Sequence, residues 1–147
     1  MTIAVEVQRA CRTVTPTNAE LRRWLKQAIQ PYRDTATVTV RIVDEAEGSA
    51  LNARWRGKTG PTNVLAFPLE GLVLIAPNLL GDIVVCAPVV AAEAAIQQKT
   101  LKQHWAHLIV HGALHLLGFA HLKRAEARAM ETVERRVLGA LGYPDPY

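Results

Sequence analysis

The sequence lacks most of the features that mark secreted, membrane-spanning and fibrous proteins. It holds two cysteines in 147 residues, Cys11 and Cys86, which is too few for the disulfide framework of a small secreted domain. No stretch approaches the roughly 20 uncharged apolar residues that cross a bilayer, because the most apolar region, residues 79–95, contains Asp82 and Glu93. The N-terminus shows no signal-peptide core. We therefore expect reduced thiols, a cytoplasmic location and no membrane contact.

Aromatic residues are also scarce, at 5%, and no repeat, low-complexity tract or domain linker interrupts the chain. The content of 50% hydrophobic and 20% charged residues excludes a disordered chain, a collagen-like repeat and a coiled-coil rod. A length of 147 residues suits one domain, which we place at residues 1–147. The 17 basic and 13 acidic side chains leave a net charge of +4. This charge is compatible with a nucleic acid or another polyanion as partner.

Hydrophobic periodicity places strands early in the chain and helices late. Ile3, Val5 and Val7 alternate with more polar residues, as in a half-buried strand, and residues 35–43 are rich in β-branched side chains. This order favours an α+β fold over a regular βαβ winding. Further strands are expected at residues 63–67, 72–75 and 81–86, and a basic loop at 54–62. Asn18 is the expected N-cap of a helix that Pro31 ends. Further helices are expected from Asp44 over Asn52, from Pro88 to Leu117 with a break at 100–104, and from Lys123 to Leu141.

One short stretch, HGALHLLGFAH at residues 111–121, concentrates the chemistry. Four residues span slightly more than one helical turn, so His111 and His115 lie on the same face, about 6 Å apart along the axis, and can bind one metal ion. His121 would lie elsewhere if the helix continued, but Gly118 can adopt a left-handed cap conformation and let the chain turn back. The predicted ligands are therefore His111, His115 and His121. Three histidines and a water form a catalytic zinc site, whereas structural sites usually have four protein ligands.

Two further histidines precede this stretch. His107 stands one turn before His111, and this rival pair could also bind a metal, but it leaves the glycine and the last histidine unexplained. We therefore expect His107 to support a ligand or to contact substrate, and His104 to lie on the surface. The spacing is also that of metzincin peptidases, in which a glutamate after the first histidine acts as general base. Gly112 occupies that position here, which argues against proteolysis.

The histidine run resembles the signature of the YbeY family, the bacterial endoribonucleases of ribosomal RNA maturation. The similarity extends to LNARWRGK at residues 51–58, followed by PTNVLAFP at 61–68, and to LGDIVVC at 80–86. Glu93 precedes the histidines and Glu134 follows them, as in the family. The likeness covers roughly residues 40–140, and the first forty residues match in outline only.

This resemblance implies an α+β fold in which about five helices pack with a small mixed sheet, and one Zn²⁺ ion held by His111, His115 and His121 at a helical C-terminal turn. It also implies that Arg56, which matches a functionally important family arginine, is catalytic, since a guanidinium binds phosphate oxygens bidentately and keeps its charge. The implied activity is that of a single-strand endoribonuclease in 3′ end maturation of small-subunit ribosomal RNA and in ribosome quality control. The implied partners are ribosomal RNA, the small ribosomal subunit and its assembly factors, and not DNA.

The chain departs from the family at Ala120, because family members commonly have aspartate immediately before the third histidine. This change leaves the metal ligands intact but removes a proton acceptor. Asp82, Glu93 and Glu126 are other acidic candidates. Two alternatives therefore stay open. One is a metallohydrolase that acts on another substrate with the same histidines, and the other is a non-enzymatic ribosome-assembly factor whose zinc holds the helix end in place.

Overall fold

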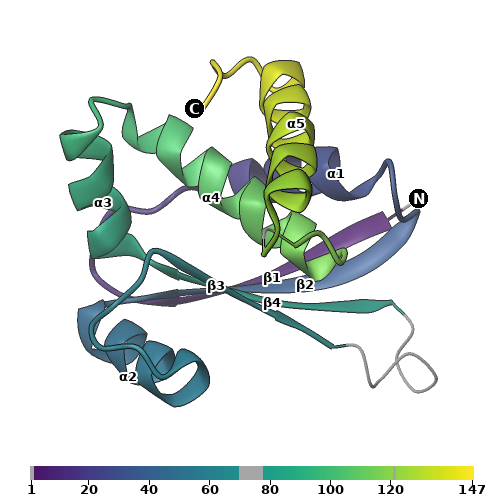
Figure 1. The fold of residues 1–147 in the computed structure, drawn as a ribbon. Coiled ribbons are helices and arrows are strands. Elements are labelled where there is room, and N and C mark those ends of the chain that lie inside the picture. Colours follow the sequence, from purple (N-terminus) through teal and green to yellow (C-terminus); the bar gives the residue numbers. More distant parts are fainter. Residues whose placement is uncertain (1, 70–77, 121) are drawn as a thin grey trace.

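The computed structural model describes residues 2–69, 78–120 and 122–147. The strand expected at residues 72–75 and the ligand expected at His121 lie outside the described residues. Every other predicted helix and strand is present. Their order along the chain is β1 (Thr2–Ala10), α1 (Asn18–Ile29), β2 (Thr35–Val43), α2 (Glu45–Arg56), β3 (Val64–Pro68), β4 (Leu79–Cys86), α3 (Ala87–Ile96), α4 (Leu101–Leu116) and α5 (Arg124–Ala140) (Figure 1).

The four described strands form one mixed sheet in the order β1-β2-β4-β3. β1 and β4 both run parallel to β2, whereas β3 pairs antiparallel with β4 at one edge. Parallel neighbours need crossover connections, and α1 supplies the crossover from β1 to β2. The mixed sheet and the five described helices confirm the predicted α+β class.

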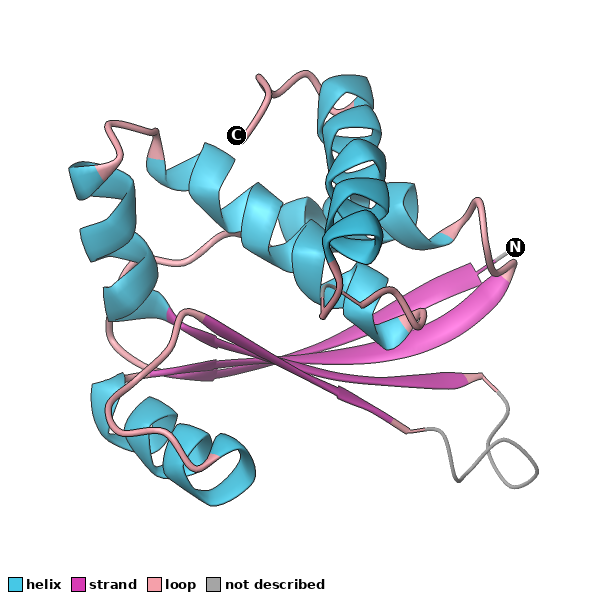
Figure 2. Ribbon diagram, in the orientation of Figure 1, coloured by secondary structure: helices cyan, strands magenta, loops and turns pink. Residues whose placement is uncertain are grey.

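The helices are distributed unequally over the two faces of the sheet. Figures 1 and 2 show α1, α4 and α5 above one face and α2 below the other. The larger core lies under the first group and includes the fully buried side chains of Trp24, Trp105 and Ile109. A smaller buried cluster on the α2 side includes Val84, and Leu51 of α2 packs against this cluster. Because α4 lies in the middle of the larger core, the position of its side chains is set by packing.

α4 approaches the sheet closely at Gly112. A Cβ atom added to this glycine would lie 3.1 Å from Cγ2 and 3.3 Å from Cδ1 of Ile83 on β4. Ile83 is itself fully buried and has little room to move. Gly112, which stands where metzincins have glutamate, therefore has a packing role in this fold.

Two boundaries differ from the prediction. The cap of α1 is Thr17 and not Asn18, because Oγ1 of Thr17 accepts a hydrogen bond from the N–H of Glu20 at 3.1 Å while the Glu20 carboxylate accepts one from the N–H of Thr17 at 3.0 Å. α2 continues to Arg56, so the first part of the predicted basic loop is helical. Basic side chains suit the negative end of the helix dipole, and the helix ends where Gly57 takes a φ of +65°.

The structure bears on two further expectations about the chain. None of the helices in the described ranges combines the length and the hydrophobicity that a membrane crossing requires. Cys11 and Cys86 are both free thiols. Burial raises the pKa of the Cys86 thiol, which makes it a poor nucleophile and a structural side chain.

Candidate functional site

A cleft of about 540 Å³ lies between α4 and the β3 edge of the sheet. Three segments that are distant in the sequence form its walls, so the fold brings together the predicted catalytic residue and two of the predicted metal ligands. The lining residues are Trp55 and Arg56 from the end of α2, residues 62–68 from β3 and the two positions before it, and His111, Gly112 and His115 from α4.

The imidazoles of His111 and His115 face each other across one turn of α4. Their Nε2 atoms are 3.1 Å apart and their ring centres 4.6 Å apart. Nδ1 of His115 lies 3.0 Å from the carbonyl oxygen of Phe119, and Nδ1 of His111 lies 3.3 Å from Oε1 of Glu134. A carbonyl and an ionised carboxylate only accept hydrogen bonds. Each Nδ1 is therefore placed to donate a hydrogen bond, and in a neutral ring this tautomer leaves Nε2 as the nitrogen with a lone pair for a metal.

This arrangement fits two positions of a tetrahedral zinc site. Zinc–nitrogen bonds of about 2.0–2.1 Å at a tetrahedral angle place two nitrogens about 3.3 Å apart, close to the 3.1 Å between the Nε2 atoms of His111 and His115. Oxygen acceptors on the far nitrogen are also typical of metal-bound histidines. Within the described ranges no group of three His, Cys, Asp or Glu side chains is placed to hold a metal, and His121 as third ligand stays a prediction.

The turn that was predicted at Gly118 is present. α4 ends at Leu116, and Gly118 has a φ of +102°, which favours glycine. The N–H of Phe119 donates to the carbonyl of Leu114 at 3.0 Å, and the N–H of Gly118 donates to the carbonyl of His115 at 3.0 Å, the pattern of a Schellman cap. The helix therefore ends directly after the two histidines. The same turn brings the carbonyl oxygen of Phe119 within hydrogen-bond distance of Nδ1 of His115.

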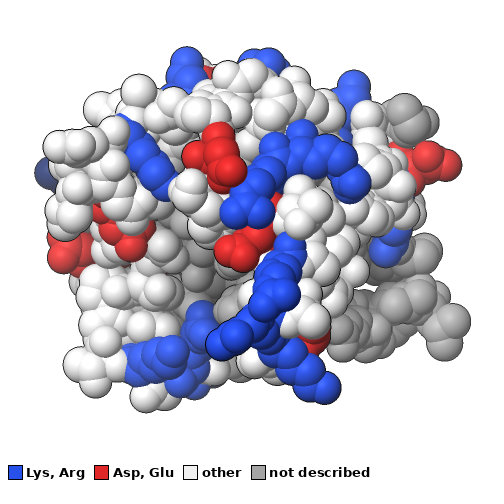
Figure 3. All heavy atoms as spheres, turned by 45° about the horizontal axis from the view of Figure 1, so that its top comes forward, with Lys and Arg blue, Asp and Glu red and all other residues white. Residues whose placement is uncertain are grey.

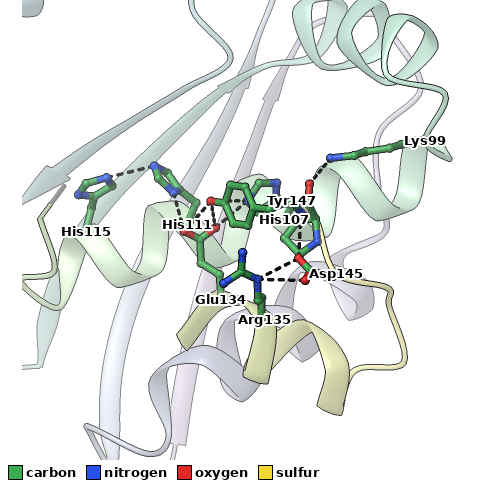
Figure 4. Close-up of polar contacts among 9 residues, drawn as sticks. Lys99, His107, His111, His115, Glu134, Arg135, Asp145 and Tyr147 are labelled. Atoms are coloured by element: carbon green, nitrogen blue, oxygen red, sulfur yellow. Dashed lines mark hydrogen bonds and ion pairs between the residues drawn. The ribbon is translucent and has the colours of Figure 1, made fainter. Parts of the chain in front are cut away.

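Glu134 lies on α5, behind the histidine pair, with only 1% of its surface exposed. Its carboxylate contacts Nδ1 of His111 at 3.3 Å, Nε2 of His107 at 2.6 Å and the hydroxyl of Tyr147 at 2.9–3.0 Å (Figure 4). Burial alone would raise the pKa of the Glu134 carboxyl, but the hydrogen bonds from His107 and His111 outweigh it and lower the pKa to about 2. Glu134 is therefore an ionised carboxylate in contact with a predicted metal ligand.

The two remaining histidines have different surroundings. His104 was expected on the surface, and this was wrong: it is 3% exposed, and its Nε2 lies 2.9 Å from Oε1 of Glu93 on α3. The helix face that carries His104 is covered by α3, a tertiary contact that the local pattern does not show. His107 and His111 both contact the carboxylate of Glu134, and their rings meet edge to face with 6.3 Å between the ring centres. This agrees with the expected supporting role rather than with a rival metal pair.

Arg56 ends α2 and is exposed at the rim of the cleft. Beside it, Trp55 is 58% exposed and meets the ring of Phe67 edge to face, with 5.9 Å between ring centres. The guanidinium of Arg54 lies 5.1 Å from the centre of the Trp55 ring. The rim of the cleft therefore combines positive charge with an exposed aromatic surface. The catalytic assignment of Arg56 stays a prediction.

Similarity to known proteins identifies the family of this chain. The sequence model of the family described as Endoribonuclease YbeY matches residues 6–142 of this chain. The chain belongs to the YbeY family. It is 49% identical over 147 residues to the protein named Endoribonuclease YbeY of Stutzerimonas stutzeri (strain A1501). This alignment covers 99% of this chain and 91% of the relative. The solution structure of TM1509 from Thermotoga maritima matches with a TM-score of 0.60 at 23% identity, over 96% of this chain and 92% of that one, and it supports the fold alone.

Sequence reasoning named Glu134 only as part of the YbeY family resemblance and did not predict its contact with the histidines. Of the candidates weighed, Asp82 interacts with Thr39 in the sheet and Glu93 with His104. Neither of these lines the cleft, nor does Glu126. The available signal was the position of Glu134 within the apolar stripe of α5, next to Val133, because a carboxylate on a core-facing stripe requires partners.

Proposed function

We propose that this protein is a zinc-dependent endoribonuclease that cuts single-stranded RNA. Its proposed role is in the cytoplasm, in 3′ end maturation of small-subunit ribosomal RNA and in ribosome quality control. One observation carries the proposal: the guanidinium of Arg56 and the imidazoles of His111 and His115 line the same cleft. Membership of a family described as endoribonucleases supports the same activity.

The metal site proposed here consists of His111, His115 and His121. The first two meet the spacing and hydrogen-bonding requirements of zinc ligands, and the Gly118 turn directs the chain back after the helix. A zinc ion held there supplies Lewis acidity and an activated water at neutral pH. The role of the protein is to hold the ring nitrogens in place and to leave one side of the site facing the cleft.

Arg56 is the proposed phosphate-binding residue. A guanidinium can donate two parallel hydrogen bonds to a phosphate, and it can stabilise charge that develops on the phosphate oxygens. The exposed face of Trp55, which is held at one edge by Phe67, offers a surface on which an unpaired base can stack. A volume of about 540 Å³ lies in the range of small-ligand sites, about 300–1,000 Å³. Such a cleft admits a short unpaired segment more readily than a duplex.

The surface charge favours a polyanionic partner. Figure 3 shows a band of Lys and Arg side chains across this face of the molecule, with acidic side chains beside it. The acidic residues of α5 are half-buried or buried, whereas its arginines are exposed. These arginines are Arg124, Arg128, Arg135 and Arg136. The small ribosomal subunit, which displays ribosomal RNA and assembly factors, is the partner we propose.

The test is cleavage of a single-stranded RNA oligonucleotide and its duplex by protein freed of contaminating nuclease. Arg56→Ala is expected to lower the cleavage rate about 100-fold or more with the fold unchanged. Arg22→Ala, which removes an exposed arginine of α1 outside the cleft, is the matched control and should cleave normally. Wild-type rates in both Arg56→Ala and His111→Ala would refute the catalytic assignment.

A second candidate function is a non-enzymatic ribosome-assembly factor. It is favoured by the absence of a carboxylate among the residues that line the described cleft, and by Ala120 at the position of the family aspartate. This reading predicts ribosome binding that Arg56→Ala leaves unchanged, but that is lost with the fold when the metal is removed. Cleavage of peptide or ester substrates in a parallel screen would instead indicate a hydrolase of another class.

A further inference from the structure

Glu134 is a charged group in an otherwise apolar position. Its neighbours on the same face of α5 include Met130, Val133 and Leu138, all buried in the core. An ionised carboxylate in such surroundings is stable only when donors satisfy its oxygens. Three side chains do so: His107 and His111, from successive turns of α4, and Tyr147, from the segment that follows α5. Figure 4 shows them converging on the carboxylate.

We propose that Glu134 is a positioning residue for His111, and that the hydroxyl of Tyr147 fixes the carboxylate in the orientation this requires. By accepting from Nδ1–H of His111, the carboxylate turns Nε2 of that ring toward His115 and the cleft. This inference rests on the proposed function in one respect: it takes His111 to be a metal ligand.

The distances explain why a second group is needed to fix the carboxylate. Oε2 of Glu134 lies 2.6 Å from His107, whereas Oε1 lies 3.3 Å from His111. The contact with His107 is therefore the stronger of the two, and it alone would allow Oε1 to rotate away from His111. The hydroxyl of Tyr147 lies 3.0 Å from Oε1 and 2.9 Å from Oε2. A donor shared by both oxygens holds the plane of the carboxylate.

Tyr147 is itself held in place by the segment that carries it. Lys99 donates to the carbonyl of Pro146 at 2.8 Å, and Arg135 contacts the carboxylate of Asp145 at 3.0–3.1 Å. That carboxylate also accepts from the N–H of Tyr147 at 2.9 Å. The segment after α5 is thus attached both to α5 and to the loop that precedes α4, and its tyrosine contacts Glu134, the group that orients a predicted ligand.

The consequence is a ligand with a fixed tautomer and a fixed orientation. A carboxylate on the far nitrogen of a metal-bound imidazole fixes the tautomer and strengthens the ligand, and its loss typically weakens metal binding about 10–100-fold. His115 receives the same support from the carbonyl of Phe119. The two rings are therefore oriented by different parts of the chain, one by a backbone turn and the other by a buried side chain.

The experiment measures Zn²⁺ affinity of the full-length protein by competition with a chromophoric chelator, together with ¹⁵N NMR of the metal-free imidazoles. Glu134→Gln is expected to weaken Zn²⁺ binding about 10–100-fold, and to reduce the Nδ1–H form of His111 that wild type shows. Tyr147→Phe removes one hydrogen bond to Glu134 and should weaken Zn²⁺ binding less than Glu134→Gln does, by roughly twofold to tenfold. Glu45→Gln, which neutralises an exposed glutamate on α2, is the control and should bind as wild type does.

The outcomes separate this inference from the function on which it rests. A folded Glu134→Gln protein with the affinity of Glu45→Gln and an unchanged His111 tautomer overturns the positioning role. If His111→Ala nevertheless abolishes Zn²⁺ binding, the proposed metal site stands although Glu134 does not position His111. If His111→Ala binds like wild type, both proposals fail. Should Glu134→Gln not fold, Tyr147→Phe decides: weaker binding supports the inference, and unchanged binding overturns it.

Discussion

Replacing Gly112 with alanine tests how tightly α4 packs on the sheet. On an open helix surface, alanine is favoured over glycine by about 1 kcal/mol. At this position the new Cβ would lie 3.1 Å from Cγ2 of the fully buried Ile83, and overpacking of a core costs about 1–3 kcal/mol. Together the two effects predict a change in the free energy of unfolding between about zero and a loss of about 2 kcal/mol.

Gly139→Ala is the matched control for this substitution. Gly139 is an exposed residue of α5, and an added Cβ would meet no atom within 4 Å, so this variant should gain up to about 1 kcal/mol. Urea unfolding followed by circular dichroism gives both free energies, provided that the m-values agree. We expect Gly139→Ala to be more stable than Gly112→Ala by about 1–3 kcal/mol. Equal stabilisation by both substitutions would refute the close packing of α4 on β4.

Three further predictions concern other parts of the molecule. Thr17→Ala removes the capping box that it forms with Glu20 and should lower the free energy of unfolding by about 0.5–2 kcal/mol in urea titrations, whereas an unchanged value would contradict the cap. Hydrogen bonds from Arg41 lower the pKa of Glu47, against an opposing effect of burial. Because the folded-state pKa is depressed, this interaction stabilises the protein above the unfolded pKa of about 4.5, and the stabilisation is lost as the pH falls below that value. Glu47→Gln should therefore reduce the dependence of the free energy of unfolding on pH in this acidic range. Saturating Zn²⁺ at 100 times its dissociation constant should stabilise the metal-free protein by about 2.7 kcal/mol, and no shift of the thermal midpoint would count against a bound ion.

Much of the fold could be predicted because its signals are local. The β-branched run of residues 35–43 predicts β2 with the bounds that the structure has, since a strand needs only alternation and side-chain shape. The turn at Gly118 follows from its place directly after the apolar helix, and it is present with a positive φ. The cap of α1 was assigned one residue too late because Thr17 and Asn18 are both good caps, and only the reciprocal contact with Glu20 distinguishes them.

What could not be predicted depends on contacts between distant segments. The carboxylate of Glu134 meets His107 across 27 positions and Tyr147 across 13, and no local pattern encodes such a meeting. The burial of His104 likewise depends on α3 packing against α4 and on Glu93 as its partner. The shared cleft of Arg56 and the histidines follows from the strand order, which places β3 beside β4 although the two segments could pair in other ways.

The strand order also bears on how the protein folds. β1 pairs with β2 across 33 positions and β3 pairs with β4 across only 13–21 positions. β4 pairs with β2 across 42–43 positions, and among the described strands β3 joins the sheet only through β4. Non-local pairing of this kind is slow, because loop closure must precede it. The wall of the cleft that carries β3 is therefore completed late. In a refolding experiment, recovery of RNA cleavage should lag behind recovery of helical circular dichroism, so that catalysis reports the last step of assembly.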